Sequence, residues 1–100
     1  MFERSQQYKL LKNARRKNVH IKINPLGYLT LELTNGNKRY LKAKFEDIHF
    51  THGKQSTKVR VKPQSDKKDW LIHLEHQDAQ DLKNKIKEAE DDFESLMDQL

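Results

Sequence analysis

The sequence contains no cysteine, only three glycines and two prolines, and no long run of apolar residues. Without cysteine, disulfide frameworks, thiolate zinc sites and cysteine nucleophiles are excluded. The glycines stand far apart, which excludes a glycine-rich phosphate-binding loop. The first twenty residues lack the apolar run of about 7–15 residues that a secretory signal has, and no window approaches a membrane span. We therefore expect a cytoplasmic protein without a membrane partner.

Charge is abundant, and the two signs are divided along the chain. Of the 100 residues, 34% are apolar and 35% charged, which suits one small domain over residues 1–100. Residues 1–65 carry 15 basic and 4 acidic side chains, whereas residues 66–100 carry 5 basic and 11 acidic ones. This division indicates either a polyanion-binding surface beside a separate acidic segment, or two parts of one domain that neutralise each other.

Residues 19–75 are predicted to hold antiparallel strands, because apolar and polar residues alternate in several short segments, as in a sheet with one buried face. These segments are 19–23, 28–33, 40–45, 48–50, 58–62 and 70–74. A three-residue turn at Pro25–Gly27 pairs Ile21 with Leu31. A two-residue Asn35-Gly36 turn would mix apolar and polar faces, so we expect a loop of odd length, which pairs Leu31 with Leu41.

The two ends of the chain are predicted from different signals. Residues 1–17 form a basic N-terminal segment, for which we expect a short helix over Glu3–Lys17 with a strand over Phe2–Leu10 as the alternative. Residues 77–100 have apolar residues at alternating spacings of three and four, which is typical of an amphipathic helix. Its apolar positions are Ala79, Leu82, Ile86, Ala89, Phe93, Leu96 and Leu100. This helix packs on its own sheet or associates with a second copy.

The predicted fold class is α+β. We expect a curved antiparallel sheet or partly open barrel of six to seven strands, with the C-terminal amphipathic helix packed on it. The meander at 19–45, the strand at 58–62 and the Trp70-bearing strand before the helix resemble the pleckstrin-homology-like superfold. That resemblance implies a scaffold that binds phosphoinositides, peptides or proteins. The order of elements also resembles a double-stranded RNA-binding domain, but the lysine-rich start of that domain's last helix is missing here.

Two surfaces are candidates for binding. The outward strand positions are basic with interleaved aromatics, a pattern that neutralises phosphates and stacks on unpaired bases. The candidate polyanion-binding residues are Lys22, Tyr40, Lys42, Lys44, Lys58, Arg60 and Lys62. Lysines on exposed strand faces also provide solubility, which leaves both interpretations open. The end of the C-terminal helix extends past a small sheet, and its candidate protein-interaction residues are Phe93, Leu96, Met97 and Leu100.

Catalytic and metal sites are not expected. The serines at positions 56, 65 and 95 have no motif around them, and the paired carboxylates Asp91 and Asp92 lie on the solvent face of a helix. The histidine pairs His49/His52 and His73/His76 have a spacing that places the two rings on opposite faces of a strand. We therefore expect no cofactor, no metal and no small-molecule substrate. The sequence favours a non-catalytic module that binds a protein partner or forms a homodimer, with DNA or RNA as the alternative ligand.

Overall fold

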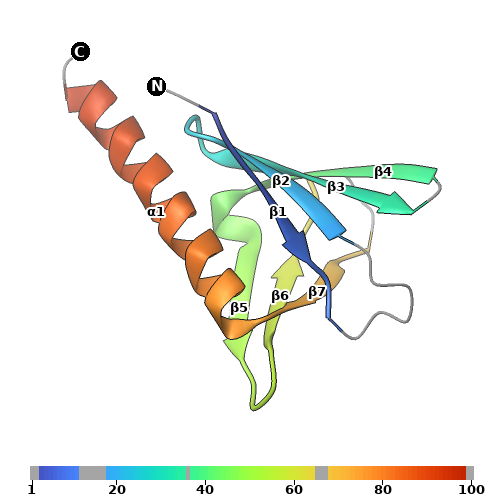
Figure 1. The fold of residues 1–100 in the computed structure, drawn as a ribbon. Coiled ribbons are helices and arrows are strands. Elements are labelled where there is room, and N and C mark those ends of the chain that lie inside the picture. The colour runs from blue at the N-terminus through green and yellow to red at the C-terminus, as the bar shows by residue number, and fades with distance from the viewer. Residues whose placement is uncertain (1–2, 12–17, 36, 65–67, 99–100) are drawn as a thin grey trace.

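The structure, a computed structural model, describes residues 3–11, 18–35, 37–64 and 68–98. Seven strands form two antiparallel sheets, ordered β1-β2-β3-β4 and β5-β6-β7, and one C-terminal helix lies beside both (Figure 1). The elements are β1 (Arg4–Lys9), β2 (Asn18–Asn24), β3 (Tyr28–Asn35), β4 (Asn37–Lys44), β5 (Ile48–His52), β6 (Thr57–Val61), β7 (Trp70–Leu74) and α1 (His76–Asp98). The α+β class predicted from the sequence is confirmed. The strands lie in two sheets that are not closed into a barrel, and not in one continuous curved sheet.

The sheets separate at a short 3-10 turn, Phe45–Asp47, between β4 and β5. The Phe45 N–H donates to the carbonyl oxygen of Gly27 at 3.0 Å, which holds this turn against the β2–β3 hairpin. Two backbone hydrogen bonds then link strands or adjoining segments of different sheets: Leu11 N–H to His73 O at 2.9 Å, and Gln64 N–H to Lys42 O at 3.1 Å. The chain therefore passes from the first sheet to the second at this turn, and these two hydrogen bonds connect the two sheets at two further points.

The registers predicted for the first two hairpins are confirmed. Ile21 pairs with Leu31, and Leu31 with Leu41, so the apolar residues of three strands share one face. Gly27 has a φ of +113°, a conformation that side-chain-bearing residues rarely adopt, and it closes the β2–β3 turn as expected. Asn35 pairs directly with Asn37, which gives the second connection its odd length.

The predicted N-terminal helix is wrong over residues 4–9, where the alternative, a strand, is confirmed. β1 pairs with β2 along six positions, from Arg4 opposite Ile23 to Lys9 opposite Asn18. This pairing satisfies the otherwise free backbone groups at the edge of β2, which a docked helix could not do. Tyr8 and Leu10 then point into the core. Residues 12–17 of the predicted helix, including Ala14, lie outside the described residues.

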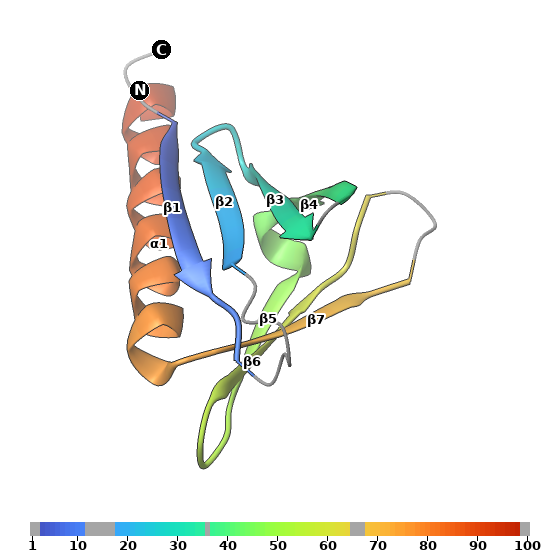
Figure 2. The same cartoon turned by 45° about the vertical axis from the view of Figure 1, so that its right-hand side comes forward.

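One core joins both sheets and the helix. The fully buried large side chains come from β2, β3, β6, β7 and α1: Val19, Ile21, Ile23, Leu29, Leu31, Val59, Val61, Leu74 and Leu82. The helix contacts β2, β6 and β7, and its apolar spacing from Ala79 to Ala89 faces the core as predicted. Burial of each large aliphatic side chain contributes about 1.5–3 kcal/mol to stability. In both views α1 runs beside β1, with its C-terminal end near the start of the chain (Figure 2). Within the described residues, no helix is both long enough and apolar enough to cross a membrane.

Candidate functional site

Four of the seven candidate polyanion-binding residues share the outer face of the β1–β4 sheet. They are Lys22, Tyr40, Lys42 and Lys44, hereafter the β2–β4 lysine cluster. Thr30 lies between Lys22 and Lys42 in one cross-strand row, so the two lysine backbones stand about 10 Å apart. Lys44 follows Lys42 by two residues, about 7 Å along the same strand. Three ammonium groups and one phenol therefore lie over a small area of strand surface.

The two tyrosines of this face have different surroundings. The Lys42 Nζ lies 4.1 Å from the centroid of the Tyr28 ring, a cation–π contact. The Asn24 side-chain amide donates a hydrogen bond to Tyr28 Oη at 2.9 Å, which fixes that ring in place. Tyr40, by contrast, is 56% exposed. Tyr40 is therefore the aromatic side chain of this cluster whose ring is open to a ligand.

The other three candidate residues form a stripe on β6 and just after it, hereafter the β6 basic stripe: Lys58, Arg60 and Lys62. They alternate with Val59 and Val61, whose burial directs the basic side chains outward. Arg60 lies between His49 and Leu71 in the register of the β5–β7 sheet. Leu71 is 49% exposed on this face.

The structure thus divides the expected basic surface between two sheets. Both sheets turn their apolar residues toward the same core, so their outer faces point in different directions. The residues of the β2–β4 lysine cluster are brought together, and so are those of the β6 basic stripe. The two groups do not form one continuous face. A ligand on one group would leave the other group free.

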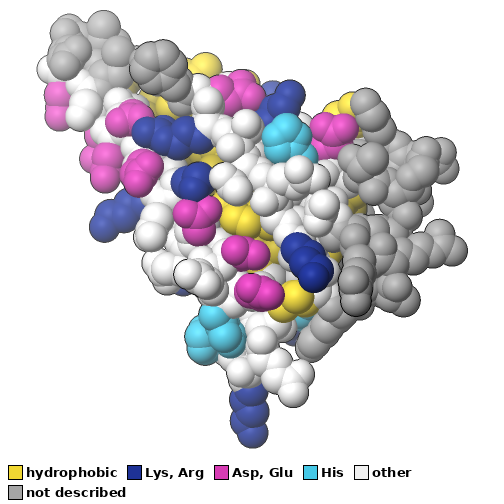
Figure 3. Space-filling model, viewed as in Figure 1, with side chains coloured by type: hydrophobic (Ala, Val, Ile, Leu, Met, Phe, Trp, Pro, Cys, Tyr) yellow, Lys and Arg dark blue, Asp and Glu magenta, His cyan; other side chains and the backbone are white. Residues whose placement is uncertain are grey.

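Most of the described acidic side chains lie on α1 (Figure 3). Their ion pairs are with Arg4 of β1 and Lys85 of α1. Arg4 contacts Glu88 at 3.5 Å and Asp92 at 2.8 Å, which ties β1 to the second half of the helix. Lys85 pairs with Asp81 one turn away at 2.7 Å. Among the described residues, no ion pair includes the β2–β4 lysine cluster or the β6 basic stripe. The helix therefore does not neutralise the strand lysines through direct contacts.

A buried tyrosine links the first strand to the helix. The Tyr8 hydroxyl donates to Asp81 Oδ2 at 2.7 Å, and Lys85 donates to both oxygens of the same carboxylate. Burial raises the pKa of Tyr8 far above its ordinary value, and the hydrogen bond to Asp81 raises it further. The hydrogen bond from Lys85, followed by that from Tyr8, lowers the pKa of Asp81. Partial burial, with Glu75 and Asp81 nearby, raises the pKa of Asp78. The contacts among Tyr8, Asp81 and Lys85 stabilise the link between β1 and α1, and they lie away from the outer strand faces.

The end of α1 continues past its ion pair with the first strand. Asp92 is the last helical residue with an ion pair to β1. Beyond it, Phe93 is half-buried and Met97 is 53% exposed. The other two candidate protein-interaction residues, Leu96 and Leu100, have side chains outside the described part of the structure. Met97 therefore marks an apolar, solvent-facing end of the helix.

The histidine contact in the structure differs from the two histidine pairs identified in the sequence. The rings of His52 and His76, one from each predicted pair, stack with centroids 3.9 Å apart. The Nδ1 atom of His76 also lies 2.8 Å from Thr57 Oγ1, within hydrogen-bonding distance. In the part of the chain that the structure describes, no three histidine or carboxylate side chains are grouped so that they could hold a metal ion. The stacked rings fasten the start of α1 to the β5–β6 hairpin.

Sequence reasoning missed the roles of Arg4 and Tyr8, because both were assigned to a helix. The local signal, Tyr8 and Leu10 on either side of Lys9, is too short to show the period of a strand. Comparison of the chain with models of protein families, with curated proteins and with solved structures finds no match. The function must therefore be inferred from the geometry of these residues.

Proposed function

We propose that the protein is a non-catalytic interaction module that binds single-stranded nucleic acid through the β2–β4 lysine cluster. The observation that carries this proposal is the separation of charge. The outward lysines have no carboxylate partner among the described residues, while the ion-paired acidic residues lie on α1. Glu32 is the one carboxylate at the described outward positions of this sheet, opposite His20 and Tyr40. An uncompensated cluster of lysines attracts phosphates and releases their counterions.

The exposed ring of Tyr40 favours a single strand over a duplex. Unpaired bases stack on aromatic side chains, and each such contact is worth about 1–3 kcal/mol. Tyr40 lies on the same strand and face as Lys42 and Lys44, so one strand of nucleic acid reaches both kinds of contact. The arrangement of two sheets and a C-terminal helix also supports the proposed pleckstrin-homology-like scaffold. In that scaffold the strands supply a rigid surface, and the β2–β4 lysine cluster supplies the contacts with the ligand.

The proposal is tested by fluorescence anisotropy with a labelled single-stranded oligonucleotide. Replacement of Lys42 and Lys44 by glutamate should abolish binding at moderate salt. The matched control replaces Lys83 and Lys87 on α1 by glutamate, which gives the same net charge and should leave most of the affinity. Tyr40→Ala should weaken binding by about 5-fold to 150-fold. If both double variants lose the same affinity, lysine position does not matter and the proposed interface is wrong.

A second candidate function is supported by the exposed apolar end of α1. Met97 and Phe93 lie beyond the ion pair that ties Asp92 to β1, so a protein partner or a second copy could pack on them. A chain that ends at Asp92 keeps both contacts of Arg4 and removes this end. Under this proposal, sedimentation velocity should show association for the full chain and a monomer for the shortened chain. Oligonucleotide binding should be equal in the two.

A further inference from the structure

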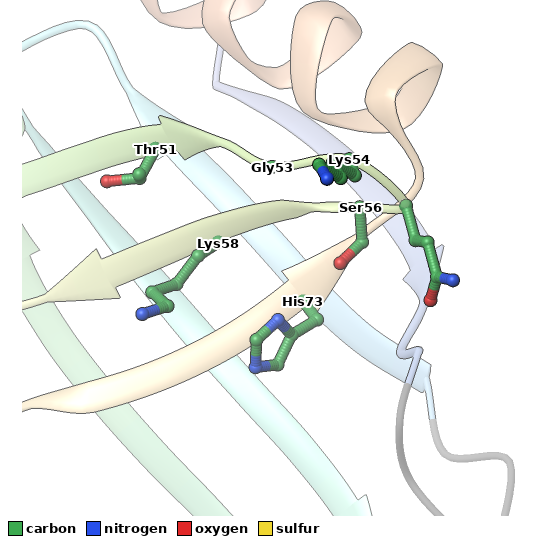
Figure 4. A pocket seen from close by; sticks show the side chains of 7 residues that line it. Thr51, Gly53, Lys54, Ser56, Lys58 and His73 are labelled. Atoms are coloured by element: carbon green, nitrogen blue, oxygen red, sulfur yellow. The ribbon is translucent and has the colours of Figure 1, made fainter.

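A concave site lies on the outer face of the β5–β7 sheet, beside the hairpin that joins β5 to β6 (Figure 4). Its volume is about 380 Å³, which is within the range of small-ligand sites. The side chains that matter for its chemistry are those of Thr51, Lys54, Ser56, Lys58 and His73. The described residues that line it include no carboxylate. The site therefore presents hydrogen-bond donors and positive charge without an opposing negative group.

Strand register and one glycine bring these side chains together. Thr51, Lys58 and His73 form one cross-strand row, with neighbouring strands about 4.8 Å apart. The hairpin closes tightly because the Gly53 N–H donates to the Ser56 carbonyl oxygen at 3.0 Å. A Cβ atom at Gly53 would lie only 2.9 Å from that oxygen, so a larger residue would force the hairpin to shift. The tight turn places Ser56 at the edge of the concavity that Thr51, Lys58 and His73 line.

Ser56 is the most enclosed polar residue of the site. It is 7% exposed, and its side chain points into the concavity beside His73 (Figure 4). No side-chain hydrogen bond of Ser56 is found among the described residues, and its hydroxyl oxygen is not among their fully buried unpartnered atoms, so it is open to the concavity. A ligand oxygen in the concavity would accept a hydrogen bond from this hydroxyl group. Thr51 offers a second hydroxyl group from the far end of the same row.

We propose that this concavity binds the phosphate group of a phosphate monoester. A monoester carries about −1.5 to −2 charge at neutral pH and has three strong acceptor oxygens. The ammonium groups of Lys54 and Lys58 match that charge, and the two hydroxyl groups match the acceptors. The volume equals that of roughly a dozen water molecules, so the group esterified to the phosphate fits as well. The ligand is either a small free monoester or the 5′-terminal phosphate of an oligonucleotide.

This site is separate from the proposed nucleic-acid surface. The β2–β4 lysine cluster lies on the other sheet, whose outer face points elsewhere. Substitutions at one site therefore leave the other intact, and each proposal is tested without the other. Lys87→Gln is the matched control, because it removes the same charge as Lys58→Gln from an exposed position on α1 that belongs to neither proposed site.

The test is a titration with phenyl phosphate at pH 7.5, followed by ¹H–¹⁵N NMR. We expect 1:1 binding, with shifts confined to the amides of residues 51–58 and His73. Loss of one charge-assisted hydrogen bond in Lys58→Gln should weaken binding about ten-fold or more, and Ser56→Ala should weaken it by a smaller factor. Lys87→Gln should bind with unchanged affinity. Equal losses in Lys58→Gln and Lys87→Gln, or shifts spread over all lysine-bearing strands, would overturn the proposal.

Two further ligands test whether the site prefers a phosphate monoester and whether that monoester is a small free molecule or the end of a nucleic acid. Diethyl phosphate carries a single charge and should bind at least about ten-fold more weakly, because fewer charge-assisted bonds form. Equal binding of the diester and the monoester would overturn the assignment to a monoester. A 5′-phosphorylated oligonucleotide that exceeds its 5′-hydroxyl counterpart in affinity, with the excess lost in Lys58→Gln, would identify a nucleic-acid terminus as the source. Binding of phenyl phosphate without such an excess would identify a small free ligand.

Discussion

The salt dependence of oligonucleotide binding reports how many phosphates the β2–β4 lysine cluster contacts. The perturbation is the double variant Lys42→Gln/Lys44→Gln, which removes two charges and keeps a polar side chain with the first two methylene groups at each position. Both lysines are exposed, and neither takes part in an ion pair among the described residues. The folded structure should therefore be retained. Lys22 remains as the single ammonium group of the cluster.

The expected magnitude follows from the three lysines of the cluster. For single strands, each neutralised phosphate contributes about 0.7 to the slope of log affinity against log salt concentration. Three contacts give a slope of about −2, so a rise from 50 to 200 mM salt should weaken binding roughly twenty-fold. With one lysine left, the slope should fall to about −0.7, and the same rise should weaken binding less than about three-fold.

The assay is an anisotropy titration at four salt concentrations between 50 and 200 mM. The matched control is Lys83→Gln/Lys87→Gln, which lowers the net charge equally from positions on α1. This control should retain the wild-type slope, because the slope counts contacts and not net charge. An unchanged slope in the strand variant, or an equal reduction in the helix variant, would refute the assignment of phosphate contacts to these lysines.

Three further predictions concern the fold. Leu82→Ala should lower the free energy of unfolding by about 2–5 kcal/mol in urea denaturation, since Leu82 is fully buried. Leu71→Ala, at a half-exposed position, should cost less than about 1 kcal/mol, and similar costs for the two would contradict the assigned core. Tyr8→Phe should cost about 1–2 kcal/mol at pH 7 through the lost hydrogen bond to Asp81. The raised pKa keeps Tyr8 protonated in the folded chain, whereas tyrosines in the unfolded chain ionise above about pH 10. The difference in free energy of unfolding between wild type and Tyr8→Phe should therefore fall by about 1.4 kcal/mol from pH 9 to pH 11. A constant difference across that range, measured by the same denaturation, would show that Tyr8 ionises normally. Gly27→Ala should lower stability by about 1–2 kcal/mol because of its positive φ, although a Cβ there meets no atom within 4 Å.

The phase of the strands could be determined from the sequence. Alternation of apolar and polar residues is a local property, and only odd-length connections keep Leu31 with both Ile21 and Leu41 on one face. The same reasoning correctly assigned Lys22, Lys42 and Lys44 to the opposite, solvent-exposed face. The spacing of Ala79, Leu82, Ile86 and Ala89 likewise determined the buried side of the helix.

The conformation of the first strand was decided by tertiary structure. Residues 4–9 contain several polar residues in succession, so neither a period of two nor a period of 3.6 is evident there. Their state depends on the free edge of β2, which offers six paired positions. Local preference is weak in such a segment, and the hydrogen bonds supplied by a neighbouring strand outweigh it.

The candidate sites could likewise be predicted only in part from the sequence. The sequence determines which side chains point outward along each strand, because that direction follows from the backbone of the strand itself. It does not determine that the basic residues occupy two sheets, or that Thr51, Lys58 and His73 line one concavity. Those groupings depend on the turn at Phe45–Asp47 and on pairing between distant strands. Contacts between residues far apart in the chain are set by packing around a common core, and only the folded structure specifies them.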